Sequence, residues 1–304
     1  MSKYILGISL FLTSIITTNG KLVQSPSYAM SYLEKFGYID STEDGNVKLR
    51  SLAGEEAISK FQHMVGVNET GVLDRSTVKA MNTPRCGNKD IVTSVPSWLR
   101  AKRRFKREDE YDGPFFGDPW PRKVITWRVV RNSNTSELKG HDSRVQLIMY
   151  EALSVWADVS GLVFRKAKRG LRPDLKIEFH KLLEDHGFDH RLILAHATSP
   201  NTDPGTYIHF NEDVKWSFHK MSSKDGRSLF EVAIHEFGHA LGLAHISDRM
   251  SIMHPRANDV FNLGSADVEH IRSLYGNPSF LSQYLNSIYK SNINELKLLS
   301  NRKL

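Results

Sequence analysis

Hydrophobic residues near the start of the chain recur at the spacing of amphipathic helices. Residues 32–38 carry an apolar face and end near a glycine, and Asp74 is placed to cap a helix that runs to Met81. Between these segments, Gly66 closes an apolar stripe with helical spacing. The stripe consists of Ala57, Ile58, Phe61, Met64 and Val65. The pattern predicts a small three-helix domain within residues 28–83.

The second half of the chain alternates short β-branched runs with helical segments. Strand-like runs occupy residues 124–130, 162–164 and 175–179. Residues 145–156 and 267–275 have the apolar spacing of helices. These segments predict an α+β domain.

The last 25 residues repeat large aliphatic residues at near-heptad spacing. The repeated residues are Leu281, Leu285, Ile288, Leu296 and Leu299. We expect an amphipathic helix over residues 279–304 that docks on the preceding domain. The alternative is a helix that contacts a partner protein or a membrane surface.

The first 20 residues have the layout of a signal peptide. A lysine precedes an apolar run over residues 4–16, and small polar residues follow it. The run is shorter than the roughly 20 residues that a membrane-spanning helix needs. We therefore expect a soluble protein without a membrane span, secreted to the extracellular space or matrix.

The positive charge is concentrated in one segment. The net charge of the chain is +7, and residues 1–107 alone hold 16 basic and 9 acidic residues. Six of these basic residues lie within residues 100–107. This local concentration argues against a nucleic-acid surface. Arg-x-Lys-Arg occurs twice in it, so we expect proprotein-convertase cleavage after Arg107.

Three histidines lie within 11 residues at metal-ligand spacing. His235 and His239 are four residues apart, so a helix would place both on one face. Gly242 allows the chain to turn, and His245 then supplies a third nitrogen. Glu236 stands beside the first ligand as a candidate general base. Three protein ligands leave a fourth position open for water, as in a catalytic zinc site. The alternative interpretation is a core helix that holds three histidines by chance.

The residues around this motif identify the chain as resembling the matrixin family of metzincin zinc endopeptidases. Met253 resembles the Met-turn of that clan. Residues 84–90, Pro-Arg-Cys-Gly-Asn-Lys-Asp, resemble the matrixin cysteine switch, in which the thiolate of Cys86 would occupy the fourth zinc position in the latent form. The resemblance covers residues 28–278 and implies a minimal matrixin without a hemopexin-like domain.

The resemblance implies a fold and a domain order. The catalytic domain would span residues 108–278, with a twisted, mostly parallel sheet, an antiparallel edge strand and three helices. A propeptide over residues 21–107 would hold the three-helix domain, the switch and the cleavage site. The implied enzyme is a monomeric zinc metalloendopeptidase that acts on protein or peptide substrates, including collagen or other matrix and secreted proteins.

The resemblance also implies a second, structural zinc and bound calcium. His196 and His209 lie in segments that match two structural-zinc ligands, and His186 with Asp189 or Asp185 would complete the site. Val214 replaces a carboxylate that binds calcium in the family. We therefore expect calcium binding to be weakened.

Two alternative interpretations remain at this stage. The first is a non-catalytic, secreted, metal-dependent binding protein on a metzincin scaffold; loss of Glu236 or of a histidine ligand would have favoured it. The second is another metzincin branch, such as the astacins. That branch lacks the Pro-Arg-Cys-Gly segment around Cys86.

Overall fold

The computed structural model describes residues 25–39, 49, 51–92, 96, 97, 99, 113–135, 137–181, 192–202 and 205–301, with side chains up to residue 291. The predicted signal peptide, the cleavage site at Arg107 and the residues His186, Asp185 and Asp189 lie outside these ranges.

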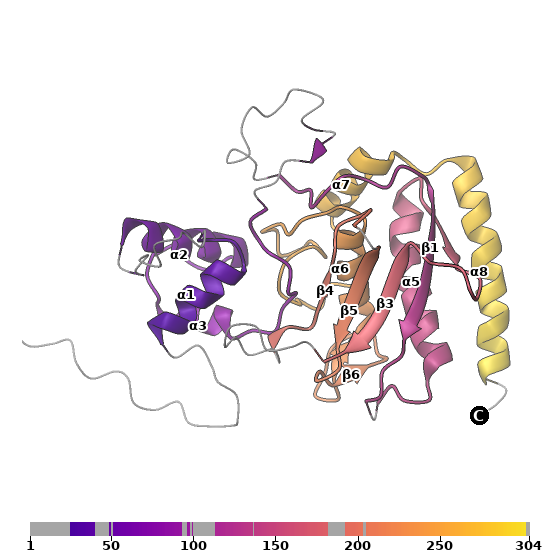
Figure 1. Cartoon of the computed structure of the whole chain (residues 1–304), viewed down its shortest axis with the longest axis horizontal. Helices are drawn as coiled ribbons and strands as arrows, with labels where there is room; N and C mark the ends of the chain where they lie inside the picture. Colours follow the sequence, from indigo (N-terminus) through magenta and orange to yellow (C-terminus); the bar gives the residue numbers. More distant parts are fainter. Residues whose placement is uncertain are drawn as a thin grey trace, which may run out of the picture.

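The N-terminal domain consists of three helices, as predicted (Figure 1). These are α1 (Pro26–Lys35), α2 (Leu52–Val65) and α3 (Arg75–Met81). Helix α1 begins earlier than its hydrophobic pattern indicated, because Ser25 caps it and proline occupies its first turn. The Asp74 side chain caps α3 by accepting a hydrogen bond from the Thr77 N–H at 2.8 Å.

A five-stranded sheet forms the second domain, with the strand order β2-β1-β3-β5-β4. The strands β1 (Val124–Arg131), β2 (Val163–Lys166), β3 (Leu175–His180) and β5 (Thr206–Asn211) are parallel. The edge strand β4 (Ala195–Ala197) runs antiparallel to β5. The predicted mostly parallel sheet with one antiparallel edge is thus confirmed. A small separate ladder pairs β6 (Trp216–Ser217) with β7 (Arg227–Ser228).

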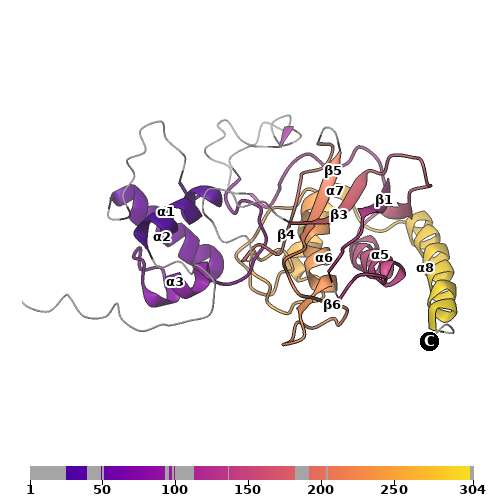
Figure 2. The same cartoon turned by 60° about the horizontal axis from the view of Figure 1, so that its bottom comes forward.

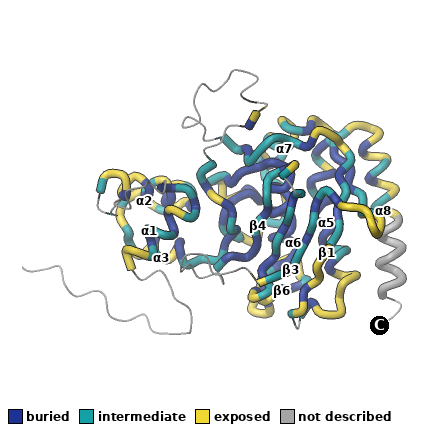
Figure 3. Tube along the Cα trace, in the orientation of Figure 1, coloured by how far each residue is buried: buried dark blue, intermediate teal, exposed yellow. Residues whose placement is uncertain are grey.

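Three helices accompany this sheet, also as predicted. They are α5 (Asp142–Val159), α6 (Leu229–Ala240) and α7 (Ser265–Tyr275). Helices α5 and α6 lie together behind the sheet (Figures 1 and 2). Every residue of α6 is buried, so this helix forms the centre of the domain (Figure 3). A helix buried on all sides holds its side chains in fixed positions.

Helix α8 (Phe280–Asn301) packs against β2 and α5, and two residues of the predicted apolar stripe lie on its outer side. Leu281 is 64% exposed and Ile288 is 40% exposed. Ser282 and Asn286 are buried instead, and Asn286 Nδ2 donates to the carbonyl of Leu162 at 3.0 Å. Asn286 points inward because the Leu162 carbonyl that it meets needs a donor. Ser282 bonds to Ser279 at the start of its own helix, and Tyr289 packs against the hydrophobic core. None of the described helices is both long and apolar enough to cross a membrane.

Candidate metal centre

Helix α6 and the turn after it bring three imidazole rings together. Ser228 caps the start of the helix, and His235 and His239 follow on one face. The chain turns at Gly242, whose φ of 100° favours glycine, and brings His245 back. The Nε2 atom of His239 lies 3.1 Å from those of His235 and His245, and these two are 3.2 Å apart.

These separations fit a tetrahedral zinc ion. Zinc–nitrogen bonds of about 2.0–2.1 Å imply nitrogen–nitrogen separations of about 3.3 Å. The Sγ atom of Cys86 lies 3.5 Å from His239 Nε2, and all four ligand atoms lie within 4.8 Å of one another. Burial lowers the pKa of His235 to about 3, so the ring is neutral, as a zinc ligand must be. The donor set therefore fits zinc.

The second nitrogen of each ring has its own acceptor. His235 Nδ1 donates to the carbonyl of Ile252 at 2.6 Å, and His239 Nδ1 donates to that of Leu243 at 2.8 Å. His245 Nδ1 donates to the carboxylate of Asp90 at 2.7 Å. Such contacts fix the tautomer and orientation of a metal-binding imidazole. The sequence did not indicate the contact to Asp90, which comes from the N-terminal segment.

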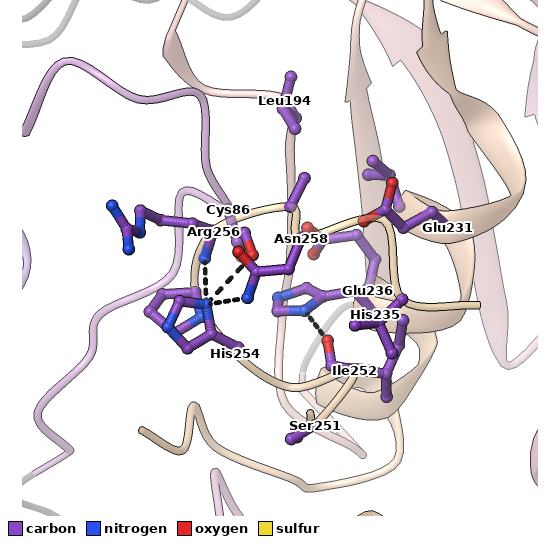
Figure 4. A pocket seen from close by; sticks show the side chains of 14 residues that line it. Cys86, Leu194, Glu231, His235, Glu236, Ser251, Ile252, His254, Arg256 and Asn258 are labelled. Carbon is purple, nitrogen blue, oxygen red and sulfur yellow. Dashed lines mark hydrogen bonds between the residues drawn. The ribbon is translucent and has the colours of Figure 1, made fainter. Parts of the chain in front are cut away.

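Glu236 is buried beside these ligands. Its carboxylate oxygens accept no N–H or O–H hydrogen bond from the described residues, and the Cys86 thiol interacts with the carboxylate. Burial raises the pKa of Glu236 to about 8. Figure 4 shows its side chain beside Cys86 and His235, at the end of the pocket. A carboxyl group with raised proton affinity and free acceptor positions is suited to take a proton from water.

The segment around Cys86 lies between two stretches of the second domain. The Cys86 N–H donates to the Pro255 carbonyl at 3.0 Å on one side. On the other side, the Gly87 N–H donates to the Ala195 carbonyl at 2.8 Å. The Asn88 side chain forms two hydrogen bonds with the backbone of Ala197, at 2.8 and 3.0 Å. An extended peptide would use the same backbone groups of edge strand β4.

A buried ion pair fixes the shape of this segment. The guanidinium of Arg85 donates to both carboxylate oxygens of Asp90, and both side chains are fully buried. Arg85 also stacks on the ring of Phe36, at 3.6 Å from its centroid, and Tyr38 donates to Asp90 at 2.6 Å. The three-helix domain thereby holds the loop in which Cys86 lies.

Met253 lies directly beneath the metal-binding helix. A Cβ atom added at Gly238 would overlap its sulfur and would come within 3.0 Å of the Trp156 ring. Asp267 fixes the Met253 turn by accepting hydrogen bonds from the Ser251 hydroxyl and the Ile252 N–H, at 2.5 and 2.9 Å. Gly238 is therefore required for close packing, not for backbone conformation.

We predict that Gly238→Ala lowers the free energy of unfolding by about 1–3 kcal/mol, the usual cost of overpacking a core. Denaturant unfolding of the full chain measures this change. Gly238→Ala and Met253→Ala combined should cost less than the sum of the two single changes, because the overlapping sulfur is absent from the double variant. An unchanged free energy of unfolding in Gly238→Ala would show that this packing is not tight.

A second group of metal-binding side chains lies on one face of the sheet. His196 on β4 and His209 on β5 are opposite each other in register, with His209 Nδ1 3.1 Å from His196 Nε2. Glu178 Oε2, on β3, lies 3.4 Å from His209 Nε2, and the His180 ring lies beside that of His209. The alternating side-chain direction of strands places all four on this face. Glu178 and His180 were not predicted as members of this group. Their spacing of two residues at the end of a predicted strand indicates that both side chains lie on one face of the sheet.

The segment expected to bind calcium is used for packing. Val214 is buried in the hydrophobic core. The Asn211 side chain donates to the Ile193 carbonyl at 2.8 Å and accepts from the Asp213 N–H at 2.9 Å. These contacts fit the expectation of weakened calcium binding.

The fold and the histidine centre define a metzincin-type zinc endopeptidase domain preceded by a helical prodomain. Residues 119–276 match the matrixin family, and this chain belongs to it. Residues 29–81 match the family described as "Putative peptidoglycan binding domain", which covers most of α1 and all of α2 and α3.

Several curated proteins are similar over most of this chain. Human matrix metalloproteinase-25 is 32% identical over 268 residues, which are 83% of this chain and 45% of that protein. Macrophage metalloelastase of Oryctolagus cuniculus is 35% identical over 83% of this chain and 50% of its own length. Hatching enzyme of Paracentrotus lividus is 32% identical over 88% and 42%. The chain thus spans at most half the length of these relatives.

Proposed function

We propose that the chain is the latent form of a secreted zinc endopeptidase that hydrolyses peptide bonds in extracellular proteins, including those of the matrix. The position of Cys86 carries this proposal. Its sulfur lies beside the three imidazole nitrogens, and its neighbours occupy the backbone groups of β4 that a substrate peptide would need. Proprotein-convertase cleavage after Arg107 would separate this segment from the catalytic domain.

Each catalytic residue has one role in this proposal. Zinc held by His235, His239 and His245 would supply Lewis acidity, which polarises the scissile carbonyl and acidifies water. Glu236 takes the proton of the attacking water on a carboxylate oxygen and passes it to the leaving amine. The carbonyl of Ala195, which binds Gly87 in the latent form, would align the substrate backbone.

Hydrolysis of a peptide library by the cleaved protein tests this function. We expect cleavage products that disappear when a chelator is added and return with zinc. A non-catalytic binding protein would release no products while still binding the metal. That alternative gives no role to the buried carboxylate of Glu236, whose oxygens accept no N–H or O–H hydrogen bond from the described residues.

We also propose a second zinc held by His196 and His209, with His186 and one of Asp185 or Asp189. The geometry of His209 supports this site, because its Nδ1 faces His196 while its Nε2 faces the carboxylate of Glu178. A carboxylate behind a metal-binding imidazole is a common arrangement. Glu178 would thus orient His209.

We predict two zinc ions per cleaved chain by elemental analysis, and one in His196→Ala. His219→Ala, which changes a histidine outside both clusters, is the matched control and should retain two. Calcium should raise the melting temperature only slightly, because Val214 and Asn211 provide no carboxylate. One zinc in the parent, or two in His196→Ala, would exclude the second site, and a large calcium-dependent shift would contradict the calcium prediction.

A further inference from the structure

A pocket extends from the metal centre along the first turns of α6 (Figure 4). Cys86, His235 and Glu236 line it beside the metal centre, and Glu231 lines it one helical turn nearer the start of α6. Its apolar walls include Leu194, Val232, Ile252 and Val260. Glu231 precedes His235 by four residues, so it lies about 6 Å from that ligand along the helix axis on the same face. A side chain adjoining the scissile bond would enter this pocket.

Glu231 is a buried carboxylate, only 3% exposed. Its Oε1 accepts a hydrogen bond from the Asp259 N–H at 2.8 Å, and its Oε2 accepts one from the Ser222 hydroxyl at 3.3 Å. A carboxylate has about four acceptor positions, so these bonds leave some unused. Burial is the main cause that raises its pKa, and the charge of Asp259 adds to it.

The described structure places no cation in an ion pair with Glu231. Arg227 acts on it only through the longer-range field. Arg256 also lines the pocket, and in this latent form its Nη2 donates to the Val65 carbonyl of the prodomain at 2.7 Å, a contact that the cleaved protein would lose. Figure 4 shows its guanidinium on the side away from Glu231. Burial lowers the pKa of His254, the other basic group of the pocket, to about 4, so that ring is neutral near pH 7.

A purely structural role does not account for this negative charge. Glu231 lies in the first turn of α6, where the helix dipole favours an acidic residue. Its two hydrogen bonds join the helix to the loops that carry Ser222 and Asp259. A glutamine could accept the Asp259 N–H on its carbonyl and donate to the Ser222 hydroxyl with its amide, so the two bonds alone do not need an ionised group. The charge remains available to a cation that enters the pocket.

We propose that Glu231 makes this pocket select a lysine or arginine side chain, on the primed-side substrate residue that adjoins the scissile bond. This inference rests on the proposed endopeptidase function. The methylene stem of the basic side chain would pack on the apolar walls, and its terminal cation would pair with the carboxylate. Pairing compensates a buried charge that otherwise costs free energy.

Quenched peptides that differ only at this substrate residue test the proposal. The full chain is first cleaved in the basic linker, and kcat/KM is then measured for leucine, lysine, arginine and glutamate peptides. We expect lysine or arginine to exceed leucine by roughly 10- to 100-fold, the scale of a desolvated charge pair. Glu231→Gln should lower kcat/KM for the lysine and arginine peptides much more than for the leucine peptide, and so remove most of this ratio.

Ser222→Ala is the matched control, because it removes one hydrogen bond to Glu231 and retains the charge. It should keep the preference for basic residues. A parent that prefers leucine, or an equal loss on all peptides in Glu231→Gln, would overturn the inference. If no peptide is cleaved, the proposed function fails. The affinities of the lysine and leucine peptides for zinc-loaded Glu236→Gln then test the selectivity of the pocket independently of catalysis. Equal affinities there would also overturn the inference.

Discussion

Glu236→Gln should lower kcat of the cleaved protein by roughly 100- to 10,000-fold, the usual contribution of general acid–base catalysis. Glutamine has nearly the same shape as glutamate but cannot take the proton from the attacking water. Neither oxygen of Glu236 accepts an N–H or O–H hydrogen bond from the described residues, so this substitution breaks no such bond. Removing a buried, unpaired carboxyl group should leave the melting temperature unchanged or raise it.

Peptide hydrolysis, zinc content and melting temperature are the three measurements for this prediction. Zinc content should stay equal to that of the parent, because the three histidines remain in place. Glu269→Gln, on the exposed side of α7, is the matched control and should keep full activity. Hydrolysis at a near-normal rate by Glu236→Gln would remove this residue from the mechanism. Loss of zinc would show that the carboxylate acts as a ligand instead.

Cys86→Ser should make the uncleaved full-length protein active. A serine hydroxyl is a much poorer zinc ligand than a thiolate, and burial already raises the pKa of the Cys86 thiol well above its usual value. A thiolate at this position would therefore need a bound zinc ion to be stable. Without that bond, the segment would leave the groove more often. We expect the peptidase activity of the uncleaved chain to rise by at least about tenfold, which corresponds to a shift of about 1.4 kcal/mol.

The comparison uses intact chains, verified by mass, in which the linker after Arg107 is uncut. Thr83→Ala is the control, since it lies three residues before Cys86 and its hydroxyl donates to the Lys79 carbonyl of α3. This control should remain as latent as the parent. Equal latency of Cys86→Ser and the parent would contradict the switch. The Arg85–Asp90 ion pair and the hydrogen bonds of Asn88 would then be sufficient to block the groove.

The sequence determined the local features of this protein because they depend on neighbouring residues. The four-residue spacing of His235 and His239 places them on one helix face in any fold. The end of α2 at Gly66 and the turn at Gly242 follow from the backbone freedom of glycine. The start of α3 follows from the capping side chain of Asp74. The alternation of strands and helices predicted an α+β domain, whereas the mostly parallel sheet with its antiparallel edge was implied by the resemblance to the matrixins.

Only the tertiary structure decided which distant residues meet. The hydrogen bond from His245 to Asp90 joins residues 155 positions apart, and no spacing rule relates them. Burial of Glu231 likewise depends on the loop around Asp259, which closes over the start of α6. For the same reason α8 forms as predicted but buries Asn286, because the surface it meets presents a carbonyl group. Local periodicity specifies an element, whereas its partners depend on long-range packing that the periodicity does not contain.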